Sequence, residues 1–335
     1  MTSRISTFFL AVILLAALTL TAITPCGVRA DSARVSGSLF ASAVLSEKDC
    51  IIVGDRGKIF LSNDGARTWQ TVESHTKYAL ASVCFPDERN GWIAGQAGAL
   101  LHSADGGRTW EAQEAGVDAF LLDVDFLDDR HGIVVGGGTT VLITDDGGTT
   151  WEPSPLKTTA GLFGDLNLFA VAMMEDGNIC AVGDMGRIFT TEDGGQTWVE
   201  TKTPLYDEQM MMGRILYALV YDSGTLYAAG IDSTFAFSKD RGKSWTVRDT
   251  GFSKPDLYCI DVVGDFGLAA GSGGHVIQTS DRGLTWHLVE VPETITRYWL
   301  SGMDLRRDAS GKVTGLVVGE RGTYGRLEGG AIDWR

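Results

Sequence analysis

Short apolar runs recur along the chain, and glycine-rich polar turns separate them. In one representative stretch these runs predict strands at residues 81–85, 91–94, 99–103 and 110–112. Other runs, such as 122–126 and 258–262, alternate in the way expected of a strand that packs against neighbours on both faces. Four short antiparallel strands within about 41 residues are typical of one blade of a β-propeller.

An eight-residue motif recurs at the turn between the third and fourth strands. The pattern Ser/Thr-x-Asp-x-Gly-x-Thr/Ser-Trp occurs six times, with successive tryptophans 41, 41, 47, 47 and 41 residues apart. Its aspartates and tryptophans are Asp64 and Trp69, Asp105 and Trp110, Asp146 and Trp151, Asp193 and Trp198, Asp240 and Trp245, and Asp281 and Trp286. We expect the aspartate to accept backbone N–H groups and the glycine to be left-handed. The tryptophan should begin the outer strand and pack against the neighbouring unit, so the motif is assigned a structural role.

A second periodic marker counts the units independently. A glycine ends an apolar run at Gly54, Gly95, Gly136, Gly183, Gly230, Gly271 and Gly319. In five of these places it opens a Gly-x-x-Gly turn, where we expect the positive φ that a two-residue hairpin needs. The seventh unit has lost the aspartate motif and keeps only Trp334. The sequence therefore predicts an all-β fold, a seven-bladed β-propeller of four-stranded antiparallel blades.

The predicted propeller is a single domain over residues 31–335. Its blades are expected at residues 38–74, 78–115, 119–155, 166–202, 214–251, 255–292 and 297–335. The sequence is compatible with two ways of closing the ring. The last outer strand is residues 331–334, or an N-terminal piece near residues 33–36 pairs with the seventh blade.

The first 30 residues have the pattern of a signal peptide. Arg4 precedes an uncharged run over residues 8–23, and small residues lead to Ala30, after which we place the cleavage site. An uncleaved membrane anchor is the alternative, because the run is slightly long for a signal. The expected location is the periplasm, or the thylakoid lumen if the source is photosynthetic.

Composition limits the classes of partner. Without the signal segment, 26 basic and 43 acidic side chains leave a net charge of −17, which argues against a nucleic-acid partner. We expect a monomer that uses no cofactor and binds no metal. Cys50, Cys84, Cys180 and Cys259 lie in apolar runs at spacings that fit no tight disulfide framework. Buried free thiols are therefore favoured over disulfides, although the compartment permits both.

Familiar catalytic motifs are missing from the sequence. A sialidase needs an arginine triad and a Tyr/Glu pair, and the Phe-Arg-Ile-Pro signature of that class is absent. No Gly-x-Ser-x-Gly motif or paired-histidine metal motif is present. Asp123, Asp125, Asp261 and Asp304 fall on predicted innermost strands, where they form either a cation-holding rim or part of a water-filled channel. A non-catalytic protein is favoured, and a sialidase-like or other carbohydrate-binding or carbohydrate-processing propeller is the alternative.

The repeats resemble those of a known family. The aspartate motif resembles the BNR (Asp-box) repeat, and residues 90–98 with 101–110 resemble the photosystem II stability and assembly factor family. The stretch 122–136 fits the same pattern, and the resemblance covers roughly residues 38–334. Members from oxygenic phototrophs are lumenal propellers that help to build photosystem II and bind its reaction-centre subunits. The resemblance implies an exported scaffold that binds a membrane-complex subunit, although a lipobox and a clustered arginine patch are missing here.

Two extended connections indicate where a partner could dock. The 47-residue spacings lengthen the loops 152–168 and 200–214, which should share one face with the turns between strands two and three. Loops carry function more often than framework residues do, and aromatic, methionine and arginine side chains are favoured in interfaces. The candidate partner-binding residues are Arg56, Phe163, Arg187, Tyr206, Met211, Arg214, Arg297, Tyr298 and Arg321. The alternative is that these residues pack down and shield the top of the propeller.

Overall fold

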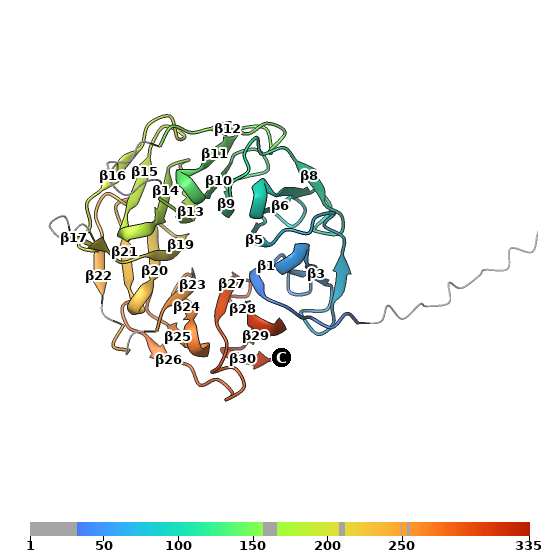
Figure 1. The fold of residues 1–335 in the computed structure, drawn as a ribbon. Coiled ribbons are helices and arrows are strands. Elements are labelled where there is room, and N and C mark those ends of the chain that lie inside the picture. Colours follow the sequence, from blue (N-terminus) through green and yellow to red (C-terminus); the bar gives the residue numbers. More distant parts are fainter. Residues whose placement is uncertain (1–31, 157–165, 208–211, 249, 253–254) are drawn as a thin grey trace, which may run out of the picture. The chain divides into compact units, whose positions relative to one another are not determined.

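A computed structural model describes residues 32–156, 166–207, 212–248, 250–252 and 255–335. Seven four-stranded antiparallel sheets radiate around a central channel, as Figure 1 shows. Each blade is built from one continuous stretch of chain, with its first strand innermost and its fourth strand outermost. The predicted seven-bladed β-propeller is therefore confirmed. Among the described residues, no helix has the length and apolar character needed to cross a bilayer.

The strands follow one another in regular order. Blade 1 has β1 (Leu39–Val44), β2 (Cys50–Gly54), β3 (Ile59–Ser62) and β4 (Gln70–Val72); blade 2 has β5 (Leu80–Cys84), β6 (Gly91–Gly95), β7 (Leu100–Ser103) and β8 (Glu111–Gln113). Blade 3 has β9 (Leu121–Phe126), β10 (Gly132–Gly136), β11 (Val141–Thr144) and β12 (Glu152–Pro153); blade 4 has β13 (Leu168–Met173), β14 (Ile179–Gly183), β15 (Ile188–Thr191) and β16 (Val199–Thr201). Blade 5 has β19 (Leu216–Asp222), β20 (Thr225–Gly230), β21 (Phe235–Ser238) and β22 (Thr246–Arg248); blade 6 has β23 (Leu257–Val263), β24 (Phe266–Gly271), β25 (Val276–Thr279) and β26 (His287–Leu288). Blade 7 has β27 (Leu300–Arg307), β28 (Val313–Gly319), β29 (Tyr324–Glu328) and β30 (Ala331–Trp334), and a small hairpin of β17 (Tyr206–Asp207) and β18 (Met212–Gly213) precedes blade 5.

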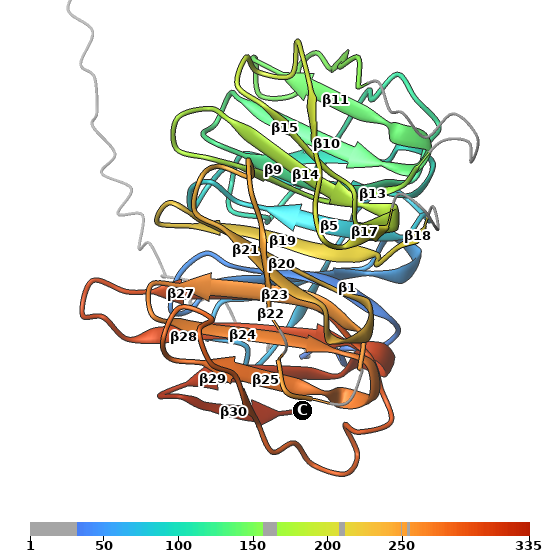
Figure 2. The same ribbon diagram turned by 90° about the vertical axis from the view of Figure 1, so that its left-hand side faces the viewer.

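A three-residue 3-10 turn joins the second and third strands of every blade. These turns are η1 (Asp55–Gly57), η2 (Gln96–Gly98), η3 (Gly137–Thr139), η4 (Asp184–Gly186), η5 (Ile231–Ser233), η6 (Ser272–Gly274) and η7 (Glu320–Gly322). They lie on the face viewed in Figure 1, together with the first residues of the innermost strands, and Figure 2 shows the ring from the side. We call this the turn face, and the opposite side, where the aspartate motifs lie, the box face.

The recurring glycine before each turn has a different cause from the one predicted. Gly136 has a φ of −171°, which is extended backbone open to any residue, and the two-residue hairpin was the wrong interpretation. The residue is glycine because a Cβ there would collide with the carbonyl oxygen of Phe120, which directly precedes β9. In every blade that carbonyl accepts a hydrogen bond from the residue after the glycine, at 2.8–3.0 Å. Positive φ occurs later in the turn, at the middle residue, as in Arg56, and at the second glycine of each Gly-x-x-Gly, as in Gly57 and Gly98, where the predicted positive φ is confirmed.

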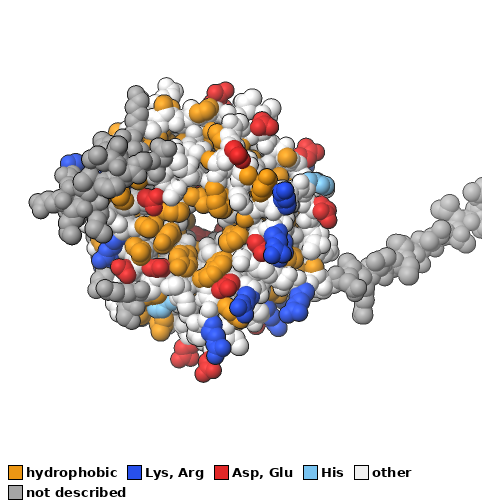
Figure 3. Space-filling view, viewed as in Figure 1, with side chains coloured by type: hydrophobic (Ala, Val, Ile, Leu, Met, Phe, Trp, Pro, Cys, Tyr) orange, Lys and Arg blue, Asp and Glu red, His pale blue; other side chains and the backbone are white. Residues whose placement is uncertain are grey.

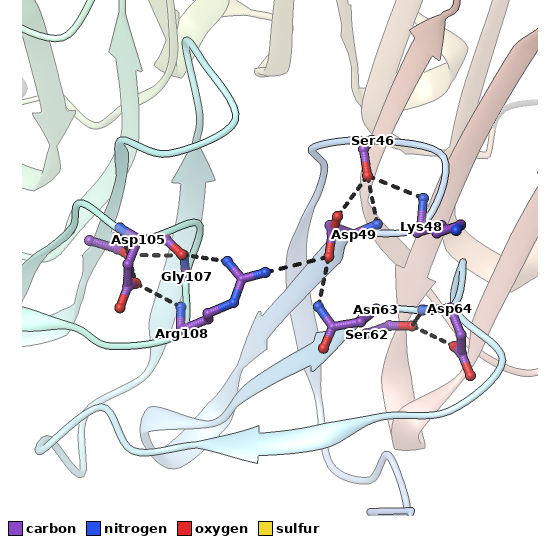
Figure 4. A network of polar contacts seen from close by, with 10 residues as sticks. Ser46, Lys48, Asp49, Ser62, Asn63, Asp64, Asp105, Gly107 and Arg108 are labelled. Atoms are coloured by element: carbon purple, nitrogen blue, oxygen red, sulfur yellow. Dashed lines mark hydrogen bonds and ion pairs between the residues drawn. The ribbon is translucent and has the colours of Figure 1, made fainter.

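The aspartate motifs have the predicted turn structure. In blade 1 the Asp64 carboxylate accepts the backbone N–H of Thr68 at 2.9 Å and the Thr68 hydroxyl at 2.6 Å. Figure 4 shows this turn beside its neighbour in blade 2, where Arg108 reaches Asp49 across the blade boundary at 3.9 Å. The hydroxyl and amide of Thr197 lower the pKa of Asp193 to about 2. These carboxylates are therefore ionised at any physiological pH.

In the part of the chain that the structure describes, the ring closes without an outer strand shared between its ends. The outer strand β30 pairs with β29, so the first of the two predicted closures is observed. Blades 7 and 1 meet through side chains, since Ser301 Oγ donates to Leu39 O at 2.9 Å and Ser42 Oγ to Leu316 O at 3.3 Å. The N-terminal segment runs across this seam, where Ala33 N bonds Trp69 O at 2.7 Å. The other end of the N-terminal segment contacts η7, where Gly322 N donates a hydrogen bond to Gly37 O at 2.6 Å.

The core lies between adjacent blades, not within any one of them. The tryptophan of each motif packs against the preceding blade, as Trp110 does against the side chains of blade 1. Cys50, Cys180 and Cys259 are buried among these layers and, with the half-buried Cys84, are free thiols. Burial raises the pKa of Cys50 to about 12, which removes its reactivity as a thiolate.

Candidate functional site

Four cationic side chains lie on the turn face of blades 1 and 7. They are Arg56 in η1, Lys58 just after it, Arg297 before β27, and Arg321 in η7, and we call them the basic sector. Figure 3 shows basic side chains gathered on this side of the face. Arg56 and Arg297 are exposed and have no ion-pair or hydrogen-bond partner among the described residues. These residues come from opposite ends of the chain, so no local stretch of the sequence shows that they share a face.

Aromatic side chains surround the mouth of the channel on the same face. Phe40, Phe169, Tyr217, Tyr258 and Trp299 form this aromatic rim, and all are partly exposed. Phe40 stacks on Trp299 with ring centres 5.8 Å apart, while Tyr217 meets Phe169 and Tyr258 edge-on at 5.4 and 5.3 Å. Figure 3 shows the hydrophobic side chains around the opening. The channel behind them has a volume of about 620 Å³.

Carboxylates lie on the turn face of blades 4 to 6. Asp184 in η4, Asp232 in η5 and Asp256 before β23 form what we call the acidic sector. Asp256 accepts the Asp232 N–H at 3.0 Å and lies 3.5 Å from the Tyr258 hydroxyl. Asp184 accepts the backbone N–H and the side-chain amide of Asn167 at 2.9 and 3.0 Å, two residues before Phe169 of the rim. Burial raises the pKa of Tyr217, and the charges of Asp256 and Asp184 raise it further. Arg214 is exposed nearby and donates a hydrogen bond to Thr234 Oγ1 at 3.2 Å.

Four aspartates deeper in the channel bind neighbouring blades together. Asp123 accepts Ser82 Oγ of blade 2 at 2.7 Å and Val171 N of blade 4 at 2.9 Å. In the same way Asp125 accepts Met173 N, Asp261 accepts Leu305 N, and Asp304 accepts Val44 N across the seam. Innermost strands would otherwise present unpaired N–H groups to the channel, which is the general problem of a sheet edge. Among the described residues no cluster of three or more His, Cys, Asp and Glu side chains is placed to hold a metal ion.

These channel carboxyls give stability a distinctive pH dependence. Burial raises the pKa of Asp123 from 3.8 to about 7 and that of Asp304 to about 6. The folded protein therefore holds these protons more tightly than the unfolded chain does. Proton binding by these two carboxyls therefore stabilises the folded state fully below about pH 4, and this stabilisation is lost as pH rises through 6 to 7.

We expect the free energy of unfolding to fall by on the order of 5 kcal/mol between pH 4.5 and 7.5, about 3 kcal/mol from Asp123 and about 2 kcal/mol from Asp304, since one pKa unit corresponds to about 1.4 kcal/mol. Urea titrations at both values measure it, and Asp123→Asn should flatten the slope because the amide does not titrate. A slope of the opposite sign, or an unchanged slope in Asp123→Asn, would contradict this assignment.

The predicted binding residues fall into three groups. Arg56, Arg297, Tyr298 and Arg321 lie on the turn face of blades 1 and 7, and the Arg321 guanidinium is 5.5 Å from the centre of the Tyr298 ring. Tyr206 lies on the β17–β18 hairpin and Arg214 follows it. Phe163 and Met211 lie outside the described residues.

Arg187 requires a correction. Its side chain is only 6% exposed, pairs with Glu200 at 2.7 Å and lies beneath the Tyr206 ring at 5.1 Å. A side chain so enclosed is not available to a partner. Arg187 instead anchors the β17–β18 hairpin to blade 4, because the hairpin's first residue covers it.

The aromatic rim was missed from the sequence, although a signal for it exists. Each innermost strand starts at a fully buried leucine, and the residue after that leucine lines the channel mouth. The leucines are Leu39, Leu80, Leu121, Leu168, Leu216, Leu257 and Leu300. In four blades the following residue is aromatic, and Leu122 adds a fifth large apolar group. Aligning the units on this leucine, and not on the glycine, would have revealed the rim.

Comparisons with known structures agree on the fold. YCF48 bound to D1 peptide matches with a TM-score of 0.67 and 17% identity, over 89% of this chain and 93% of that one. YCF48 from Cyanidioschyzon merolae matches with a TM-score of 0.66 and 18% identity, over 88% and 97%. A GH74 xyloglucanase from Xanthomonas campestris matches with a TM-score of 0.69 and 14% identity, over 91% of this chain and 55% of that one.

Sequence comparison adds the family. No curated protein matches the sequence. The family model described as photosynthesis system II assembly factor YCF48 matches residues 34–114 and 108–205, which together make up half of the chain. The matched residues span blades 1 to 4 and include the first four aspartate motifs. The chain therefore belongs to the family of photosystem II assembly factor YCF48, whose BNR repeats form its propeller.

Proposed function

We propose that this protein is a non-catalytic scaffold that binds a segment of a protein partner across its turn face, at or near a membrane complex. The observation that carries the proposal is the basic sector, in which Arg56 and Arg297 are exposed without partners among the described residues, beside the aromatic rim. Arginine and aromatic side chains dominate the binding energy of protein interfaces. Family membership supports the same role, as does the D1 peptide named for one YCF48 structure.

The proposed setting is outside the cytoplasm, with the protein acting as a monomer. The support is the uncharged run over residues 8–23 and the small residues that end at Ala30, which lie outside the described residues. A protein of this class would meet the exported parts of a membrane complex, in the periplasm or in a thylakoid lumen. Detection of a mature N-terminus at Asp31 by mass spectrometry would test export, and an intact N-terminus in the purified native protein would contradict it.

A glycan-processing function is the second candidate, because the GH74 xyloglucanase shares the fold. Glycoside hydrolysis needs two carboxyl groups free to act on the bond as acid and as base or nucleophile. The channel aspartates are engaged otherwise, since Asp123 and Asp125 accept backbone N–H groups of blade 4 at 2.9 and 2.7 Å. We therefore expect no turnover of fluorogenic glycosides or xyloglucan. Measurable hydrolysis that disappears in Asp123→Asn or Asp125→Asn would favour the enzyme instead.

Affinity capture tests the binding role directly. Tagged full-length protein should recover a membrane-complex subunit from detergent extracts of the native membranes, identified by mass spectrometry. Arg56→Glu with Arg321→Glu should reduce recovery at least tenfold, because both side chains belong to the basic sector. The matched control is Arg241→Glu with Lys243→Glu, which changes charge equally on the box face and should leave recovery unchanged. Equal recovery by all three proteins would overturn the assignment of the turn face.

A further inference from the structure

The basic and acidic sectors lie on different sides of the apolar channel mouth. This arrangement favours one orientation of a peptide bound across the turn face over the reverse orientation. From it we infer that the partner segment is an extended peptide with an apolar, preferably aromatic, side chain between an acidic and a basic stretch, bound in one orientation across the channel mouth. The inference rests on the proposed function and adds the chemistry and direction of the ligand. The acidic stretch lies over blades 7 and 1, and the basic stretch over blades 4 to 6.

The channel mouth supplies the anchor site. The channel that it opens into has a volume of about 620 Å³ over its whole length, within the usual range of ligand pockets. Phe40, Phe169, Tyr217 and Tyr258 line it and are partly exposed, so they offer ring faces and edges to an entering group. Aromatic pairs in stacked or edge-on geometry attract beyond simple burial. An aromatic side chain of the peptide would extend the existing row of Phe169, Tyr217 and Tyr258.

The charged sectors supply the direction. On the side of blades 7 and 1, Arg56 and Arg297 are exposed and unpaired among the described residues, while Lys58 and Arg321 are partly balanced by Asp55 and Glu320. On the other side Asp232 is exposed and Asp256 lies against the rim, and these carboxylates outnumber the exposed Arg214, which donates to the neutral Thr234 Oγ1. Each exposed pair contributes little affinity, but complementary charge across an interface selects orientation and rejects the reverse one.

The spacing of the sectors favours a chain over a small molecule. Blade 1 and blades 4 and 5 lie on opposite sides of the central opening, as Figure 1 shows. A compact ligand held in the mouth would contact the rim and at most one sector. An extended peptide crosses the rim and contacts both sectors, so its acidic stretch meets the basic sector while its basic stretch meets the acidic sector.

A synthetic peptide tests the orientation directly. The probe has three acidic residues, a phenylalanine between glycines, and three basic residues, with a fluorophore for anisotropy and a benzophenone at either end. With benzophenone at the acidic end, photo-crosslinks to the full-length protein should fall in blades 7 and 1. With benzophenone at the basic end they should fall in blades 4 to 6. Replacing the phenylalanine by alanine should weaken binding at least tenfold.

Protein variants separate this inference from the proposed function. Arg56→Glu with Arg321→Glu should weaken the probe at least tenfold, whereas Arg241→Glu with Lys243→Glu on the box face should not change its affinity. Two results would overturn the inference and leave the proposed function standing. One is a set of crosslinks that does not depend on which end of the peptide carries the benzophenone. The other is a protein that fails to bind the probe but still captures its native partner. Failure of native capture, described above, overturns the proposed function and the inference with it.

Discussion

Trp69→Ala should lower the free energy of unfolding by about 3–5 kcal/mol, the usual cost of removing a large buried aromatic side chain. Trp69 is 2% exposed and packs with Leu316 and Val318 of blade 7, with the Tyr324 ring edge-on at 5.6 Å. It therefore fills the seam between the first and last blades. Because the described residues include no outer strand shared by blades 7 and 1, side-chain packing of this kind holds the seam closed together with the hydrogen bonds of the N-terminal segment. Urea denaturation followed by tryptophan fluorescence measures the loss.

The matched control for Trp69→Ala is Trp110→Ala, one blade further on. Trp110 is 3% exposed in the boundary between blades 1 and 2, so its loss should cost a similar amount. Only Trp69→Ala should also speed hydrogen exchange in β1 and β27, the innermost strands that flank the seam. A cost below about 1 kcal/mol for Trp69→Ala, or seam strands as protected as in the wild type, would show that the ring is closed by other contacts.

Gly136→Ala should destabilise the protein by roughly 1–3 kcal/mol or more, the range for forcing atoms into filled space. A Cβ at Gly136 would collide with the Phe120 carbonyl oxygen, which is backbone and already accepts the Gly137 N–H at 2.9 Å. The strand start would have to move to make room. Thermal denaturation monitored by circular dichroism measures the effect.

The neighbouring Gly137→Ala provides the control. A Cβ there would come no closer than 3.4 Å to Asn167 Oδ1, and other blades carry Asp, Gln, Ile, Ser or Glu at this position. This change should be neutral or slightly stabilising, because alanine restricts the unfolded chain. A Gly136→Ala protein as stable as Gly137→Ala would contradict the steric explanation for the repeating glycine.

Local turn chemistry made the fold predictable from the sequence. The aspartate of each motif is bound within four residues of itself, as Asp64 is by Thr68, so the pattern is complete in one short stretch. The glycine marker also counted the blades correctly, although its physical cause was misread. That cause lies in a residue far from the glycine in sequence, the Phe120 carbonyl for Gly136, which no local pattern shows.

The site was only partly predictable, because ring closure creates it. Arg56 and Arg321 lie 265 positions apart but on neighbouring blades, so the basic sector has no sequence signature. Arg187 looked like an exposed loop-face cation, yet Glu200 and Tyr206 enclose it. Burial by a neighbouring hairpin depends on tertiary packing, which the residue pattern around Arg187 does not contain. The same limitation hid the interblade bonds of Asp123 and Asp304.

The central claim is that a partner binds across the turn face. Hydrogen–deuterium exchange of the full-length protein, alone and with the partner recovered by capture, tests it most directly. We expect slower exchange in η1, η7 and the first residues of β1, β19 and β23, with no change in the aspartate-motif turns of the box face. Protection confined to the box face or to the outer strands would contradict the claim.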